Sequence, residues 1–219
     1  MLSVLDLLDA GTLSIAQAAW LLDRILRGSS WLVGARPGGA GKTTIMAALL
    51  AMLPERESVL LAAEGTGWER ASRGECVVAY EIGAGSYRAY VWGPALERFA
   101  ALGERGVRLI SNLHADTLEQ AEQQIVRRNG VSPRHFSHFG LFLPISLGRG
   151  GRWVPTVTRI SYHDGEAWRP LSTDEGQVGQ LPRIARWLEC MSDGTARTVE
   201  AVRAAWLEFL RQGAGGTQA

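Results

Sequence analysis

A glycine-rich segment that ends in a lysine and two threonines is the part of this sequence that could do chemistry. The segment reads Arg36-Pro37-Gly38-Gly39-Ala40-Gly41-Lys42-Thr43-Thr44. Glycines let backbone N–H groups approach phosphate oxygens closely, and a helix that starts there adds the positive end of its dipole. In the related pattern GxxxxGK[ST], the lysine reaches the β- and γ-phosphates and the next hydroxyl completes a Mg²⁺ shell. We therefore predict that ATP and Mg²⁺ bind at Gly38, Gly39, Ala40, Gly41, Lys42, Thr43 and Thr44, with Thr43 as metal ligand.

The segment departs from that pattern at its first position, where Arg36 replaces the usual glycine. Because that glycine only opens the loop, the sequence leaves open a tolerated variant and a distorted loop of weak affinity. A glycine-rich turn that binds nothing is the remaining alternative. An apolar run before the loop and an apolar-faced helix after it disfavour that alternative.

The flanking residues predict the elements that position this loop. Apolar periodicity, capping residues and turn residues indicate a helix over 14–27 capped by Thr12 or Ser14, a strand over 31–35, a helix over 42–53 and a strand over 59–63 that ends in Glu64. The order strand, loop, helix, strand opens a parallel α/β sheet.

The middle of the chain predicts a hairpin and then a crossover unit. Two alternating runs, 76–82 and 86–92, are separated by three small residues, which is typical of a β-hairpin. A helix over 94–105, a strand over 107–111 and a helix over 116–128 follow.

The remaining residues predict a β region over 141–171, with strands at 141–147, 153–162 and 167–171, and then a terminal helical pair within 178–211. We expect a helical segment over 1–28, an ATPase core over 29–175, a helical appendage over 176–212 and a disordered tail over 213–219.

Composition places few limits on function. The formal net charge of +1 gives no global field that would favour nucleic acid or an anionic membrane. Cys76 and Cys190 are 114 positions apart without a metal-binding or redox motif, which indicates two reduced thiols. The longest apolar run, 45–53, is about half of what a bilayer span needs. Together with the lack of a signal-like start, this predicts a cytoplasmic protein.

Two segments resemble a known family. Residues 11–54 are similar to the secretion ATPases of type II and type IV secretion, type IV pili and archaeal flagella. Ser111-Asn112-Leu113-His114-Ala115-Asp116 is similar to the family's histidine box, and Glu64 stands 22 positions after Lys42, where the family has an acidic box.

The resemblance implies a RecA-like P-loop fold and ATP hydrolysis. It implies that Glu64 polarises the attacking water and that His114 senses the γ-phosphate. It further implies a homo-hexamer that acts in a membrane-associated secretion or pilus complex, at the inner face of the cell membrane. Most of the family's N-terminal domain has no counterpart here, and the stretch between acidic box and histidine box is short. Arg70 and Arg73 could supply its arginines, although solvated loop arginines are the commoner case.

The family's second acid has two candidate positions. By composition, the apolar run 77–80 leads to Glu81, which would then be catalytic. By topology, a right-handed crossover makes 86–92 the parallel strand, and a gap-free count places the acid on Tyr90. We favour the topological interpretation at this stage, with Glu81 as the fallback.

Three other functions stay open. Arg36, the shortened middle and Tyr90 favour a degenerate module that binds ATP without hydrolysing it. A partitioning ATPase is another, although Pro37 stands where that class carries a second lysine. A small-molecule kinase is the third and the least favoured, because the sequence shows no arginine cluster of the kind that forms a kinase lid.

Overall fold

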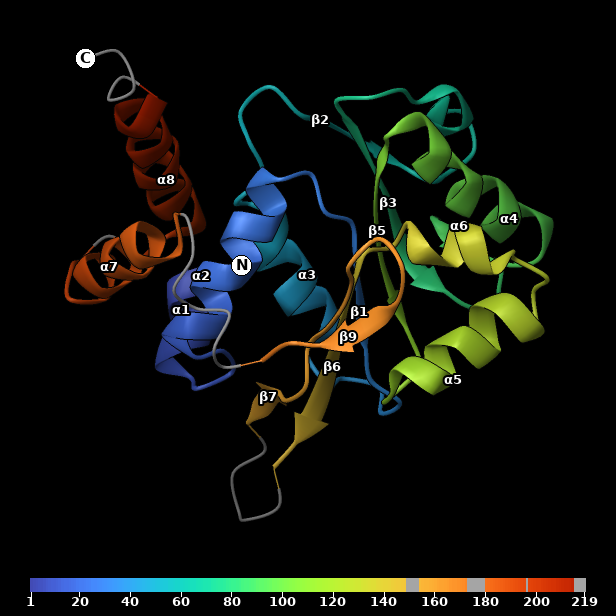
Figure 1. Ribbon diagram of the computed structural model, residues 1–219, viewed down its shortest axis with the longest axis horizontal. Coiled ribbons are helices and arrows are strands. Elements are labelled where there is room, and N and C mark those ends of the chain that lie inside the picture. The colour runs from blue at the N-terminus through green and yellow to red at the C-terminus, as the bar shows by residue number, and fades with distance from the viewer. Residues whose placement is uncertain (149–153, 173–179, 196, 215–219) are drawn as a thin grey trace.

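A mainly parallel sheet runs through the molecule and carries the glycine-rich loop on one of its central strands (Figure 1). The computed structural model describes residues 1–148, 154–172, 180–195 and 197–214, and in these residues nine strands form the sheet. The strands are β1 (Trp31–Gly34), β2 (Ser58–Leu61), β3 (Glu75–Ile82), β4 (Tyr90–Val91), β5 (Arg108–Leu113), β6 (Leu141–Leu147), β7 (Pro155–Val157), β8 (Ser161–His163) and β9 (Trp168–Pro170). The order across the sheet is β2-β3-β5-β1-β6-β8-β9, with β4 on β3 and β7 on β6.

Strands β2, β3, β4, β5, β1 and β6 run parallel, whereas β7, β8 and β9 are antiparallel to their neighbours. Every residue of β1 and β5 is buried, as expected for parallel strands that helices cover on both faces. The last residue of β1 is Gly34, where a Cβ would collide with the Ala115 carbonyl oxygen and the Phe142 ring, so the close packing here requires glycine. Because β1, β5 and β3 pair in parallel, their carboxyl ends lie at one edge of the sheet.

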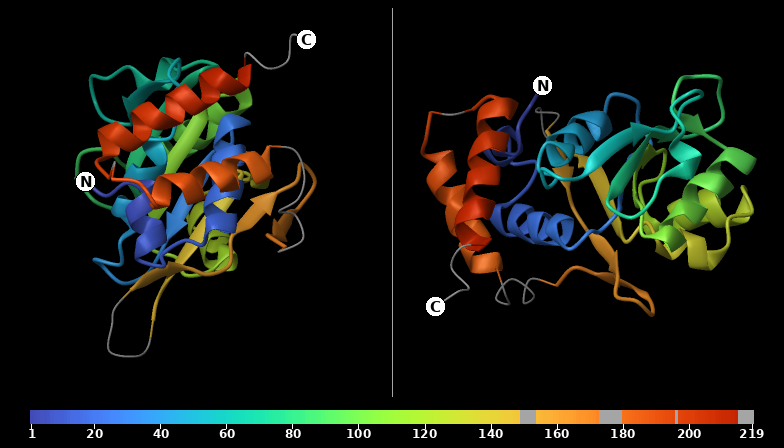
Figure 2. Two further views of the ribbon diagram at one scale, coloured as in Figure 1. Left: turned by 90° about the vertical axis from the view of Figure 1, so that its left-hand side faces the viewer. Right: turned by 90° about the horizontal axis from the view of Figure 1, so that it is seen from above.

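Helices cover both faces of this sheet (Figures 1 and 2). They are α1 (Val4–Asp9), α2 (Ile15–Leu26), α3 (Lys42–Leu50), α4 (Pro94–Ala101), α5 (Leu118–Glu122), α6 (Pro133–Ser137), α7 (Leu181–Ser192) and α8 (Val199–Ala214), with 3₁₀ turns η1 (Trp68–Arg70) and η2 (Leu102–Arg105) and a π-helical turn η3 (Gln123–Arg127). One apolar cluster joins one face to α1, α2, α3, α7 and α8; we call this the α3 side. A second cluster joins the other face to α4, α5 and α6; we call this the α4 side.

Most predicted elements are confirmed. Ser14 caps α2 in a reciprocal capping box with Gln17. The helix over 94–105 is α4 followed by η2, and the helix over 116–128 is α5 followed by η3. The strand predicted over 153–162 is divided into β7 and β8, and its first residue lies outside the described residues. The short helices α1 and α6 were not predicted.

The predicted β-hairpin of 76–82 and 86–92 is wrong. β3 pairs in parallel with β5 along its length, and β4 pairs in parallel with only the last two residues of β3. The loop over 83–89 therefore has to return by about two residues, roughly 7 Å, before the chain runs forward again. Three small residues after a strand suit that short return as well as they suit a hairpin.

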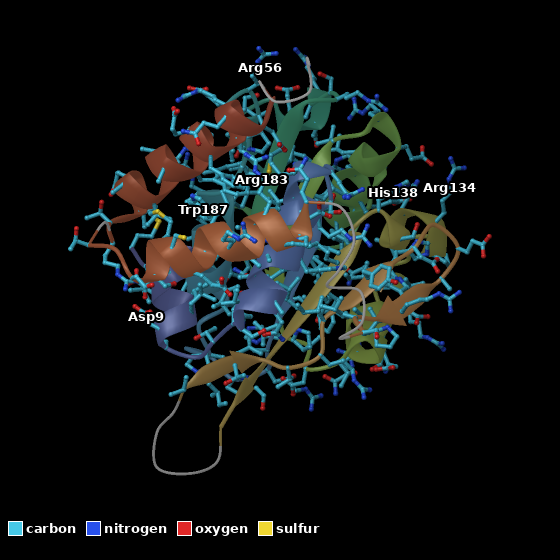
Figure 3. The ribbon with its side chains drawn as sticks, turned by 60° about the vertical axis from the view of Figure 1, so that its left-hand side comes forward. Asp9, Arg56, Arg134, His138, Arg183 and Trp187 are labelled. Atoms are coloured by element: carbon cyan, nitrogen blue, oxygen red, sulfur yellow. The ribbon has the colours of Figure 1, made fainter. Side chains whose placement is uncertain are left out.

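The C-terminal helices pack on the same cluster as α3 (Figure 2). Trp206 on α8 is fully buried, and its indole Nε1 donates to the Met52 carbonyl oxygen at 2.8 Å. Arg203 donates to the Ala51 and Leu53 carbonyl oxygens, so α8 satisfies acceptors at the end of α3. Figure 3 shows α7 with Trp187, whose ring centroid lies 5.1 Å from that of Trp206.

Helix α8 continues to Ala214, two residues into the predicted tail; the rest of that tail, 215–219, lies outside the described residues. Within the described ranges, no helix is both long enough and apolar enough to cross a membrane.

Candidate phosphate-binding site

The glycine-rich loop joins β1 to the first turn of α3 at the carboxyl edge of the sheet. Gly41 precedes α3 in a left-handed conformation with φ of 89°, which a glycine adopts without strain. Within the described chain, the backbone N–H groups of Gly41 and of the first three residues of α3 donate to no other protein group, whereas Ile45 N–H bonds the Gly41 carbonyl. A helix start with open donors is a site for an anion.

Lys42 is only 7% exposed, and its ammonium group points back across the loop. Its Nζ donates to the Ala35 carbonyl oxygen at 3.0 Å and lies 3.5 Å from His114 Nδ1. Burial lowers the pKa of Lys42, while the charges of Glu81 and Asp116 act in the opposite direction. The lysine is thus partly desolvated, and the charges of two carboxylates favour its protonated form.

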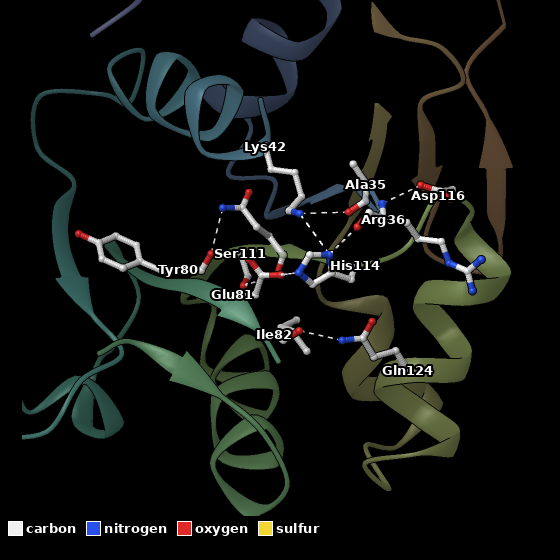
Figure 4. A network of polar contacts seen from close by, with 11 residues as sticks. Ala35, Arg36, Lys42, Tyr80, Glu81, Ile82, Ser111, His114, Asp116 and Gln124 are labelled. Carbon is white, nitrogen blue, oxygen red and sulfur yellow. Dashed lines mark hydrogen bonds and ion pairs between the residues drawn. The ribbon is translucent and has the colours of Figure 1, made fainter. Parts of the chain in front are cut away.

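His114 directly follows β5 and lies between Lys42 and the end of β3 (Figure 4). Its Nε2 is 2.8 Å from Glu81 Oε1, and its Nδ1 is 2.9 Å from the Arg36 carbonyl oxygen. The approach to Glu81 is close but not aligned as a hydrogen bond. The Glu81 side chain is 11% exposed and that of His114 is 52% exposed.

Glu81, the fallback position of the second acid, is therefore the one that meets His114 beside the lysine. The topological interpretation is wrong, because β3 and not β4 lies beside β5. Tyr90 is the register partner of Glu81 on β4. Burial raises the pKa of Tyr90, and the charge of Glu81 raises it further.

Glu64 is exposed in the turn after β2, and β3 and β5 separate β2 from β1. In the described part of the chain, no hydrogen bond or ion pair links Glu64 to Lys42, Glu81 or His114. Its catalytic role stays a prediction.

Arg36 is exposed at the loop opening and is held through its backbone. Its N–H donates to Asp116 Oδ1 at 2.7 Å, and its carbonyl oxygen meets His114. Asp116 was not proposed as a site residue, although it closes the segment that resembles the histidine box. Of the two arginines considered as substitutes, Arg73 lies beside Gly106, before the start of β5 and so at the opposite edge of the sheet. Arg70 is exposed in η1.

The residues present fit a triphosphate with Mg²⁺. The open N–H groups and Lys42 offer donors for phosphate oxygens, and a Cβ at Gly38 or Gly39 would meet no atom within 4 Å, which leaves room for a ligand. Thr43 is exposed in the first turn of α3, where its hydroxyl is free to join a metal shell. Among the described residues, no group of three or more histidine, cysteine or acidic side chains is placed to hold a metal ion.

No family model matches the chain, and no curated protein matches it in sequence. Among solved structures, the VirB11 ATPase from the Brucella suis type IV secretion system, in complex with sulphate, is similar with a TM-score of 0.47 and 12% identity, over 70% of this chain and 59% of that protein. The Legionella pneumophila ATPase DotB is similar with a TM-score of 0.46 and 10% identity, over 91% of this chain and 62% of that protein. The chain thus spans about three fifths of their length. With TM-scores below 0.5, neither protein indicates which residues act here.

Proposed function

We propose that this chain is a RecA-like P-loop ATPase, related to the secretion ATPases that its sequence resembles, and that it binds ATP with Mg²⁺ on residues 38–44. One observation carries the proposal. Lys42 Nζ lies 3.5 Å from His114 Nδ1, and His114 Nε2 lies 2.8 Å from Glu81 Oε1, beside the open start of α3. Phosphoryl transfer needs mainly positioned charges, and this edge supplies a cation, a carboxylate and backbone donors.

Each group has a distinct role in this proposal. The N–H groups of 41–44 and Lys42 hold phosphate oxygens, and the Thr43 hydroxyl joins the Mg²⁺ shell. Bound Mg²⁺ neutralises part of the charge on the phosphates. Glu81 orients the attacking water, and His114 holds Glu81 on one side and the Arg36 carbonyl on the other. Glu64 is the alternative that the resemblance implies for the water-orienting role.

A second candidate is a module that binds ATP and turns it over slowly or not at all. It is favoured by the bond from Lys42 to the Ala35 carbonyl, which must be exchanged for phosphate, and by the anchoring of Arg36 in place of a glycine. A partitioning ATPase is disfavoured further, because Lys42 is the only lysine in the sequence.

Binding is tested by calorimetric titration of the chain with ATP and Mg²⁺. A hydrogen bond to a charged group contributes about 1.5–3 kcal/mol, so Lys42→Met should weaken binding by roughly 10- to 150-fold. Arg186→Met removes one exposed cation on α7 and serves as the matched control. Equal affinity of wild type and Lys42→Met would rule out the loop as the site.

Assembly is tested by chromatography with light scattering, with and without ATP and Mg²⁺. The family resemblance implies a nucleotide-dependent hexamer. A monomer under both conditions would favour the binding module and contradict a ring motor.

A further inference from the structure

The strand that carries Glu81 is irregular at that residue. β3 and β5 are in register at Ala79 with Ser111 and again at Ile82 with Leu113, so three steps along β3 match two steps along β5. One extra residue in one strand of a pair is a β-bulge, which turns the side chains that follow it. The bulge in β3 lies at Tyr80 and Glu81.

Burial shows the effect of this bulge on the direction of the side chains. Val77 and Ala79 belong to the cluster on the α4 side, and Ile82 belongs to it as well, although regular alternation would place residue 82 on the other face. Regular alternation would also have placed Glu81 with Val77 and Ala79, away from Lys42. At the bulge Glu81 instead meets His114, whose Nδ1 lies 3.5 Å from Lys42 Nζ.

Two side chains bond the backbone of β3 on either side of Glu81. Asn112 Nδ2 donates to the Tyr80 carbonyl oxygen at 2.9 Å. Gln124 Nε2 donates to the Ile82 carbonyl oxygen at 2.7 Å (Figure 4). A bulge interrupts the regular ladder of backbone hydrogen bonds, and buried carbonyl groups need partners. These amides therefore satisfy the backbone on both sides of the irregularity.

Gln124 is itself held in a specific geometry. It lies in the π-helical turn η3, a widened turn that is rare in helices and frequent at functional sites. Its carbonyl oxygen accepts from Asn129 Nδ2 at 2.7 Å, and Asn129 Oδ1 accepts from Gly93 N–H at 2.8 Å, just before α4. The position of Gln124 is thus fixed by two connected elements on the α4 side.

We propose that Asn112 and Gln124 are positioning residues: they hold the bulge in β3 that aims Glu81 at Lys42 and His114. The geometric part concerns only this chain. The catalytic consequence, a properly placed Glu81, rests on the proposed ATPase function.

A nucleotide-free measurement tests the geometric part. Lys42 is the only lysine, so protein grown with ¹³Cε-lysine gives one side-chain NMR signal from the site. Glu81 Oε1 lies 2.8 Å from His114 Nε2, and His114 Nδ1 lies 3.5 Å from Lys42 Nζ, so Glu81→Gln should shift this signal at constant pH. We expect Gln124→Leu to shift it in the same direction by at least half as much. Gln123→Leu, an exposed neighbour in the same turn, is the matched control and should leave the signal in place.

The double variant Gln124→Leu with Glu81→Gln separates positioning from a general disturbance. If Gln124 acts through Glu81, the double variant gives the same signal position as Glu81→Gln alone. Additive shifts, or a wild-type signal in Gln124→Leu, would overturn the proposal. Asn112→Ala repeats the test if circular dichroism shows that this variant is folded. Because Asn112 is 1% exposed and its removal can disturb folding, the variant of the half-buried Gln124 decides the proposal.

Turnover tests the catalytic part. Gln124→Leu should lower kcat about tenfold or more and leave the calorimetric Kd for ATP within twofold, because the phosphate-binding groups are untouched. A rise in Kd with kcat unchanged would contradict a positioning role. If wild type binds no ATP, the proposed function fails, whereas the lysine signal still decides whether the bulge aims Glu81.

Discussion

Glu81→Gln and Glu64→Gln together decide which carboxylate orients the water in this proposal. Glu81 is 11% exposed and its Oε1 lies 2.8 Å from His114 Nε2, so its charge acts in a partly desolvated site. Glu64 is exposed beyond β2, with two strands between β2 and the loop-bearing β1. Glutamine matches glutamate in size, so each variant removes the charge and the basic oxygen without creating a cavity.

A positioned general base contributes about 10²- to 10⁴-fold to rate, or roughly 3–5.5 kcal/mol of the barrier. We expect that loss in kcat for Glu81→Gln. The Kd for ATP should stay equal or decrease, because a carboxylate that would repel phosphates has become neutral. A substitution at an exposed position typically changes energies by less than about 0.5 kcal/mol, so Glu64→Gln should keep kcat within about twofold to threefold.

The assay is steady-state phosphate release at saturating ATP and Mg²⁺, with affinity measured separately by calorimetry. Loss of turnover in Glu64→Gln with normal turnover in Glu81→Gln would refute the assignment. Tight ATP binding by wild type without turnover above the Glu81→Gln background would establish the second candidate, the binding module.

Three further predictions concern groups outside the site. Arg108 is 4% exposed, its Nη2 lies 2.8 Å from Glu57 Oε2, and it also donates to two backbone carbonyl oxygens. Arg108→Met should therefore lower the free energy of unfolding by about 3–5 kcal/mol and the Tm by on the order of 10 °C, measured by calorimetry. An unchanged Tm would contradict this prediction. Trp206→Ala removes a fully buried ring and an indole hydrogen bond, so denaturant unfolding should show a loss of about 3–5 kcal/mol, whereas a loss below 1 kcal/mol would mean that α8 is only loosely attached. Burial raises the pKa of the Cys76 thiol from 9.0 to about 12, so the unfolded chain loses this proton first, and stability present below pH ~9 should fall as the pH rises toward ~12. Cys76→Ala should remove that part of the pH dependence, and in native protein a thiol reagent should modify only the exposed Cys190.

The sequence alone determined the local features of this protein. The glycines and Lys42 predicted a loop before a helix because glycine tolerates left-handed backbone conformations, and Gly41 adopts one. Ser14 was one of the two predicted caps of α2, because a serine side chain can satisfy an N–H group only three residues away, as it does here. His114 was predicted correctly at a strand end, because the apolar run before it and the helix after it are both recognised from neighbouring residues.

Only the tertiary structure decided which of the two positions, Glu81 or Tyr90, meets His114 beside the lysine. Glu81 and Tyr90 are nine residues apart in sequence, and the strand patterns around them are alike. Whether β3 or β4 lies beside β5 depends on packing across the whole sheet, which no local pattern encodes. The direction of Glu81 depends further on one extra residue in β3, and the amides of Asn112 and Gln124 that bond the strand there come from other elements. Side-chain direction in a strand has a period of two, so a single inserted residue reverses it, and apolar periodicity does not reveal such an insertion.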